Sequence, residues 1–121
     1  LFGSDKEMSI TSAINQMTQS RCIDLGGKTK LGDAIDIMSL CETVISNDSG
    51  LMHVAAALNI KLIAIYGSSD PHHTPPMHPD ARIQYLALPC SPCFKRVCPL
   101  AGEAHMACLN QIHPKDLINQ L

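Results

Sequence analysis

Apolar and polar residues follow one another in blocks whose spacing predicts strands and helices in turn. The run Lys61–Tyr66 is almost entirely apolar, which is typical of a strand covered on both faces in a parallel sheet. Further strands are predicted at Leu1–Phe2, Cys22–Leu25, Thr43–Ser46 and Arg82–Leu88, and helices at Lys6–Gln19, Leu31–Leu40, Leu51–Leu58 and Pro114–Leu121. Because strands alternate with helices, the pattern predicts βαβ units and an α/β fold with a parallel sheet.

Two segments interrupt this alternation. Gly67–Pro76 contains three prolines and several polar residues, so we expect a long turn there. Pro89–Asn110 has no clear period and holds four cysteines, so we expect an irregular segment over about residues 89–110. The whole chain of 121 residues is long enough for one ordinary domain. Since it starts without Met, at the end of a predicted strand, we expect a single but fragmentary domain over residues 1–121.

Composition narrows the class of function. Hydrophobic residues make up 45% and charged residues 17%, which favours a folded chain. The net charge of −2 offers no basic surface, and aromatic residues at 3% offer few stacking platforms, so we expect no nucleic-acid partner. No apolar stretch approaches the roughly 18 residues of a membrane span, and the first residues do not resemble a signal peptide. We therefore expect no transmembrane segment and a cytoplasmic protein.

The most informative stretch joins the strand ending at Ser46 to the helix starting near Leu51. Between them stand Asn47, Asp48, Ser49 and Gly50. Helix N-termini bind phosphate because their first N–H groups lack intrahelical partners and the helix dipole is positive there. Ser49 and Gly50 are small enough for a ligand to come close, and His53 follows about one turn later. This spacing points to a phosphorylated ligand, with an ordinary capped turn as the alternative, since Asp and Ser are also common N-caps.

The run Ser46–Ala57 resembles the ADP-heptose:lipopolysaccharide heptosyltransferases of glycosyltransferase family nine. Ile65–Pro71 and Thr74–Pro76 are similar to a second region of that family, and Leu1–Ser4 and Gly27–Leu31 resemble its ribose-side and adenine-side turns. The resemblance implies a Rossmann-like parallel sheet with helices on both faces, forming the second, nucleotide-sugar-binding half of a GT-B glycosyltransferase.

Site residues follow from the same resemblance. It implies that Ser49 and Gly50 hold the donor pyrophosphate, that Asp48 lies beside the phosphates and heptose hydroxyls, and that His53 completes the pocket. It further places Glu7 at the ribose and Thr29 at the adenine loop.

The resemblance also implies an enzyme that inverts the anomeric centre and needs no metal or other cofactor. Its donor would be ADP-heptose and its acceptor the lipopolysaccharide core, at the inner face of the membrane. The general base belongs to the other half of such an enzyme, so we expect no catalytic residue in this chain and no activity from the fragment alone. From the residues alone, a carboxylate such as Glu7 in a first helical turn is explained equally by the helix dipole.

The cysteines leave several states open. Cys22 and Cys41 fall in predicted regular structure, where cysteine behaves as a small buried apolar residue. The other four lie within nineteen residues, a spacing compatible with reduced thiols, a disulfide or, less favoured, a zinc site; they are Cys90, Cys93, Cys98 and Cys108.

Other functional hypotheses remain beside heptose transfer. The first is another nucleotide-sugar transferase or a 2-epimerase of the same architecture, which nucleotide preference would separate. The second is a non-catalytic α/β interaction module in which residues 47–50 are only a capped turn. A cysteine-based zinc or redox module is a third.

Overall fold

The computed structural model describes residues 1–121, and the chain divides into two compact units, Leu1–Leu40 and Cys41–Leu121. In order, the helices and strands are η1 Asp5–Glu7, α1 Met8–Met17, α2 Leu31–Met38, β1 Thr43–Asn47, α3 Gly50–Ala57, β2 Lys61–Tyr66, β3 Arg82–Tyr85, η2 Gly102–Ala104, α4 Ala107–Asn110 and α5 Pro114–Ile118.

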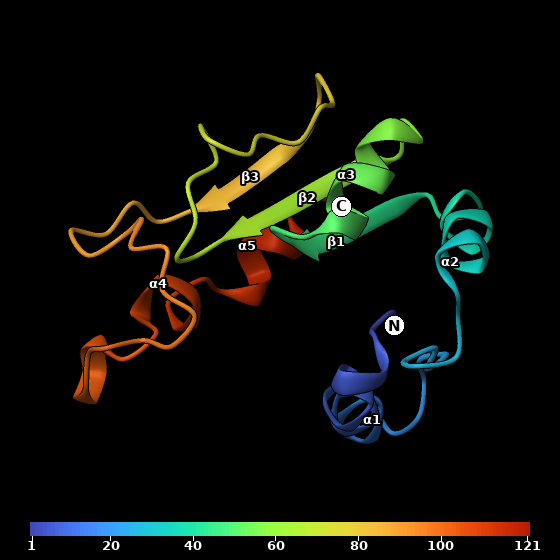
Figure 1. The fold of residues 1–121 in the computed structure, drawn as a ribbon, viewed down its shortest axis with the longest axis horizontal. Helices are drawn as coiled ribbons and strands as arrows, with labels where there is room; N and C mark the ends of the chain where they lie inside the picture. The colour runs from blue at the N-terminus through green and yellow to red at the C-terminus, as the bar shows by residue number, and fades with distance from the viewer. The chain divides into compact units, whose positions relative to one another are not determined.

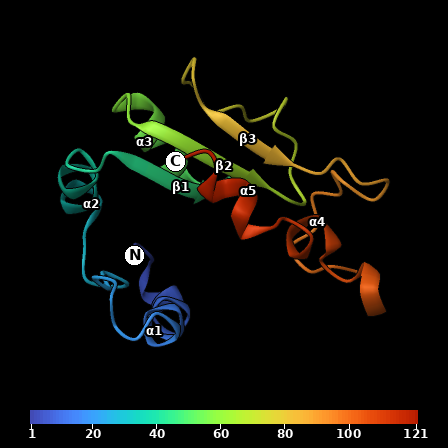
Figure 2. The same ribbon diagram turned by 180° about the vertical axis from the view of Figure 1, so that it is seen from behind.

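The second unit is built on a parallel sheet of three strands in the order β1-β2-β3. Thr43 of β1 is opposite Lys61 of β2, and Ile63 of β2 is opposite Arg82 of β3. Helix α3 connects β1 to β2 and packs on both of these strands, while α5 lies on the other face of the sheet (Figures 1 and 2). The predicted parallel α/β sheet is therefore confirmed.

The core of this unit lies between β2 and α3. Leu62, Ile63 and Tyr66 are completely buried, which explains why β2 reads as a continuous apolar run. Met52 and Ala55 of α3 are completely buried as well. Ala56 of α3 is also buried, on the helix that packs on β1 and β2.

The first unit contains helices but no strand. The predicted helix Lys6–Gln19 is present as η1 and α1, and it ends where Gln19 and Ser20 adopt left-handed backbone angles. The predicted strands Leu1–Phe2 and Cys22–Leu25 are wrong as regular elements, although Leu25 N donates to Leu1 O over 2.9 Å. Leu1 N also donates to Ile23 O and Gly27 N to Gly3 O, while an Asp24 carboxylate oxygen accepts from Gly26 N at 3.0 Å and forms a turn in this segment.

The second unit also differs from the prediction, most clearly at the end of β3 and in the segment that follows it. Strand β3 ends at Tyr85 instead of Leu88, because Ala87 has φ of 49°, which is incompatible with an extended strand. The segment predicted as irregular contains two short helices, η2 and α4, and α4 begins after Met106 at φ of 51°. Neither helix spans more than four residues, too few for a hydrophobic period to be visible in the sequence.

None of the helices is both long and apolar enough to cross a membrane.

Candidate functional site

The turn between β1 and α3 has the strand–turn–helix geometry that the sequence predicts. Strand β1 ends at Asn47, and Asp48 N still donates to Ile65 O of β2 at 3.2 Å, so the backbone ladder continues into the turn. Ser49 is extended, with φ of −156° and ψ of 167°, and the helix begins at Gly50. The turn therefore lies at the carboxyl edge of the parallel sheet, where open α/β sheets bind their ligands.

No side chain caps the N-terminus of α3. Ser49 occupies the N-cap position, but its hydroxyl pairs with the Ser46 hydroxyl at 3.2 Å and makes no capping hydrogen bond. A Cβ atom added at Gly50 would meet no atom within 4 Å, so the space in front of this residue is open. His53 follows in the first turn of α3 and is half-buried. The backbone therefore follows the path of an ordinary capped turn, but no side chain makes the capping hydrogen bond.

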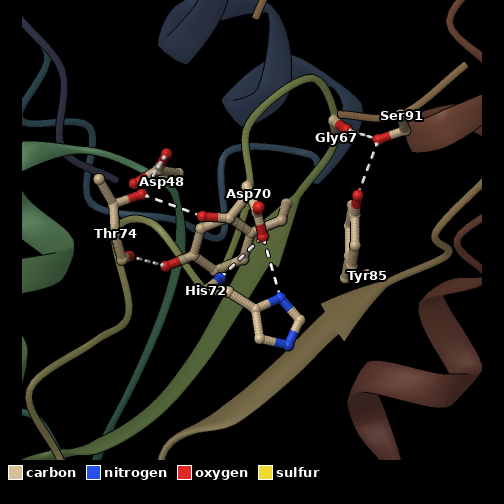
Figure 3. Close-up of polar contacts among 8 residues, drawn as sticks. Asp48, Gly67, Asp70, His72, Thr74, Tyr85 and Ser91 are labelled. Atoms are coloured by element: carbon tan, nitrogen blue, oxygen red, sulfur yellow. Dashed lines mark hydrogen bonds and ion pairs between the residues drawn. The ribbon is translucent and has the colours of Figure 1, made fainter. Parts of the chain in front are cut away.

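A chain of hydrogen bonds connects this turn to the loop after β2. Thr74 Oγ1 donates to Asp48 Oδ2 at 3.2 Å, as Figure 3 shows. Tyr66, at the end of β2, donates its hydroxyl hydrogen to Thr74 O at 2.6 Å. Burial raises the pKa of Tyr66 above its usual range, and the nearby charge of Asp48 raises it further. The phenol is therefore held in its neutral, hydrogen-donating form.

Asp70 shapes the loop itself. One of its carboxylate oxygens accepts from His72 N at 2.8 Å and lies 3.0 Å from His72 Nδ1 (Figure 3). These contacts, led by the backbone hydrogen bond, hold the pKa of Asp70 below its usual range. His72 is almost fully exposed, so the pair forms a surface turn and is no catalytic dyad.

The cysteine-rich segment packs against the start of the same loop. Cys93 N and Phe94 N donate to Ser68 O at 3.0 and 2.7 Å, and the Ser91 hydroxyl donates to Gly67 O (Figure 3). A Cβ atom at Gly67 would lie 2.7 Å from the Leu109 side chain of α4, so a larger residue there would require Leu109 to move.

None of the six cysteines is paired in a disulfide in this structure. No three His, Cys, Asp or Glu side chains are arranged to hold a metal ion, so the zinc alternative for Cys90, Cys93, Cys98 and Cys108 gains no support. Burial raises the pKa of Cys108, and the three neighbouring thiols contribute in the same direction.

Two predicted binding residues lie in the first unit. Glu7 Oε2 accepts from Ser4 N at 2.7 Å and from Ser4 Oγ at 2.8 Å, and these bonds hold the pKa of Glu7 below its usual range. The carboxylate thus supports the N-terminus of the first helix, as the helix-dipole explanation predicts. Thr29 is half-buried in the turn before α2.

Sequence reasoning missed Tyr66 and Thr74 as members of the site. Both stand inside the Ile65–Pro71 and Thr74–Pro76 regions that carry the family resemblance, but their spacing of eight residues gives no sign of a contact with Asp48. One signal was present in the sequence: a tyrosine at the end of a largely apolar strand is expected to be buried, and its hydroxyl group then requires a hydrogen-bond partner.

The fold defines a Rossmann-like α/β unit, and the turn after β1 is a candidate ligand site at its carboxyl edge. The chain belongs to glycosyltransferase family 9 (heptosyltransferase), whose family model matches residues 1–103. It is 45% identical over 87 residues to lipooligosaccharide heptosyltransferase 2 of Haemophilus influenzae, covering 69% of this chain and 25% of that protein. It is 46% identical to lipopolysaccharide heptosyltransferase 2 of Escherichia coli with the same coverage.

Solved structures agree with this assignment. The chain superimposes on E. coli ADP-heptose lps heptosyltransferase II with a TM-score of 0.75 and 37% identity, covering 99% of this chain and 34% of that one. It matches the family 9 glycosyl transferase of Veillonella parvula with a TM-score of 0.63 and 29% identity, over 69% of this chain and 24% of that one. The match to the H. influenzae and E. coli heptosyltransferases spans about a quarter of the length of each of these relatives.

Proposed function

We propose that this chain supplies the nucleotide-sugar-binding domain of an enzyme that transfers heptose from ADP-heptose to the lipopolysaccharide core. The observation that carries the proposal is the turn after β1, where an uncapped helix N-terminus and the hydrogen-bonded carboxylate of Asp48 stand side by side in a family 9 chain. The names of the heptosyltransferase relatives support the reaction. The similarity to the E. coli ADP-heptose lps heptosyltransferase II supports ADP-heptose as the donor.

In this proposal the amides at Ser49 and Gly50 bind the donor diphosphate, Asp48 lies beside the phosphates and the heptose hydroxyls, and His53 completes that pocket. Heptose transfer releases ADP, so negative charge develops on the leaving diphosphate. N–H groups fixed at a helix N-terminus stabilise such charge without moving, and losing one donor of this kind typically costs about 10²–10³ in rate. We therefore propose a reaction that needs no metal ion, with the general base supplied by another part of the enzyme.

Gly50→Ala tests the diphosphate position. The added methyl group meets open space in the protein, so the melting temperature should not fall. In the ligand complex the same methyl group would obstruct the diphosphate, and losing hydrogen bonds to a charged group weakens binding roughly tenfold or more. Calorimetric titration of the full-length protein with ADP should show this loss, while UDP should bind poorly to the wild type.

Gly32→Ala is the matched control, because it also adds a methyl group to open space near the start of a helix. It should leave ADP affinity unchanged. Equal affinity for UDP and ADP would favour another nucleotide-sugar enzyme, and no nucleotide binding by the wild type would favour an interaction module. Unchanged ADP affinity in Gly50→Ala would refute this diphosphate position. Retained heptose transfer after EDTA treatment would support the metal-free reaction, and loss restored by a divalent ion would refute it.

A further inference from the structure

Tyr66 is the starting point, because it is a polar group in the middle of the core. Its side chain is completely buried at the carboxyl end of β2, and its hydroxyl lies 2.6 Å from Thr74 O and 3.4 Å from Met52 Sδ. Phenylalanine would fill the same space, so the hydroxyl group of Tyr66 is not needed for packing. Its role is the hydrogen bond to Thr74 O, which fixes the backbone of Thr74 relative to the sheet.

Thr74 in turn makes a hydrogen bond to Asp48 in the turn after β1. Its hydroxyl group has one hydrogen and two acceptors within reach, Asp48 Oδ2 at 3.2 Å and Asp70 O at 3.4 Å. Asp70 O already accepts from Thr74 N at 3.1 Å, and a carboxylate is the stronger acceptor. The hydroxyl hydrogen is therefore directed to Asp48.

Asp48 then has one oxygen engaged and one free. Oδ2 accepts from Thr74, whereas Oδ1 has no partner in the protein and is not buried. A carboxylate is repelled by a diphosphate but accepts hydrogen bonds readily from the neutral hydroxyl groups of a sugar. A carboxylate held in one orientation next to an uncapped helix N-terminus thus suits a ligand that carries a sugar beyond its diphosphate.

We propose that Tyr66 and Thr74 are positioning residues, which orient the Asp48 carboxylate so that the site favours a nucleotide sugar over the corresponding nucleoside diphosphate. The inference rests on the proposed function, because it takes the turn after β1 as the donor site. It adds that sugar recognition depends on a loop 26 residues away in the sequence. It also predicts that binding selectivity, and not only affinity, changes when the hydroxyl group of Thr74 is removed.

The test is calorimetric titration of the full-length protein with ADP-heptose and with ADP. Thr74→Val keeps the side-chain shape but removes the hydroxyl group, so ADP-heptose should bind about tenfold more weakly. ADP should bind within about twofold of the wild type, since the diphosphate contacts are unchanged. Thr74→Ser, which keeps the hydroxyl group, should restore ADP-heptose binding. Tyr66→Phe should act in the same direction as Thr74→Val.

A double-mutant cycle separates positioning from general stability. If Thr74 acts through Asp48, then Thr74→Val should cause no further loss in an Asp48→Ala background. Independent losses in the cycle, equal losses for both ligands, or no rescue by Thr74→Ser would overturn the positioning roles while leaving the donor site intact. A wild-type protein that binds neither ligand would overturn the proposed function and this inference together.

Discussion

The two compact units of the chain are each stabilised by different forces. In Cys41–Leu121 a parallel sheet and α3 enclose completely buried side chains such as Leu62, Ile63 and Met52. In Leu1–Leu40 the buried residues are few, while Met8, Ile10 and Met17 of α1 are exposed. This unit relies on backbone hydrogen bonds between residues 1–3 and 23–27 and on the Ser4–Glu7 contact.

The ionisable groups follow this contrast in part. In the first unit hydrogen bonds from backbone N–H groups lower the pKa of Glu7 and of Asp24. In the second unit burial raises the pKa of Tyr66 and of Cys108. Burial is the leading cause of the pKa shifts of Tyr66 and Cys108, whereas backbone hydrogen bonds lower carboxylate pKa values in both units, since the bond from His72 N also lowers the pKa of Asp70. The candidate donor turn depends on both burial and polar contacts. The fully buried Tyr66 holds Thr74 by a hydrogen bond, and Thr74 in turn donates to the half-buried Asp48.

The largest effect that tests this contrast is expected from Ile63→Ala. Ile63 is completely buried in β2, so removing its side chain should lower the free energy of unfolding by about 2–5 kcal/mol. Ile10→Ala is the matched change in the first unit, where the side chain is 58% exposed, and it should change stability by no more than about 0.5 kcal/mol. Urea unfolding of the full-length protein measures both. Similar losses for the two variants would show that burial does not distinguish the units.

A larger residue at Gly26 tests how closely the first unit is packed around this glycine. A Cβ atom there would collide with the Thr11 hydroxyl group and lie 3.1 Å from Thr11 Cβ, so Gly26→Ala should destabilise the protein by about 1–3 kcal/mol. Gly32→Ala adds the same atom in open space within α2 and should stabilise the protein by about 0.4–1 kcal/mol. Thermal unfolding compares the two variants. Adding Thr11→Ala to Gly26→Ala should restore much of the loss, and failure to do so would rule out this collision as the cause.

The smallest effect concerns the chemistry of Cys108. Because burial and neighbouring thiols raise its pKa, its reactive thiolate forms only at higher pH than in an ordinary cysteine. Iodoacetamide should therefore modify Cys108 slowly at neutral pH, with a rate that climbs as the pH rises through the elevated pKa. Mass spectrometry of each cysteine against pH measures this profile, and the urea-unfolded protein is the control in which the shift should vanish. A profile that is the same in both states would contradict burial as its cause.

The sequence predicted the second unit better than the first. Strand β2 has the predicted bounds, and β1 and α3 differ from the prediction by about one residue, because hydrophobic periodicity reports burial directly. The strand predicted at Cys22–Leu25 is wrong as a regular element, because residues 23–27 make three backbone hydrogen bonds to residues 1–3 without forming a strand, and a turn at Asp24 and Gly26 interrupts the segment. Ala87 and Met106 adopt left-handed backbone angles, which neither residue type favours. The end of β3 and the start of α4 could therefore not be predicted from the sequence.

By itself the sequence determined that a strand, a small-residue turn and a helix follow one another, so that Asp48, Ser49 and Gly50 are neighbours by covalent connection. Only the tertiary structure decided that Thr74 contacts Asp48, that Tyr66 holds Thr74, and that Ser91 and Cys93 reach the loop at Gly67 and Ser68. Local spacing fixes contacts within one strand or one helical turn. Contacts across loops depend on the path of the backbone, which the packing of the sheet, α3 and α4 sets as a whole.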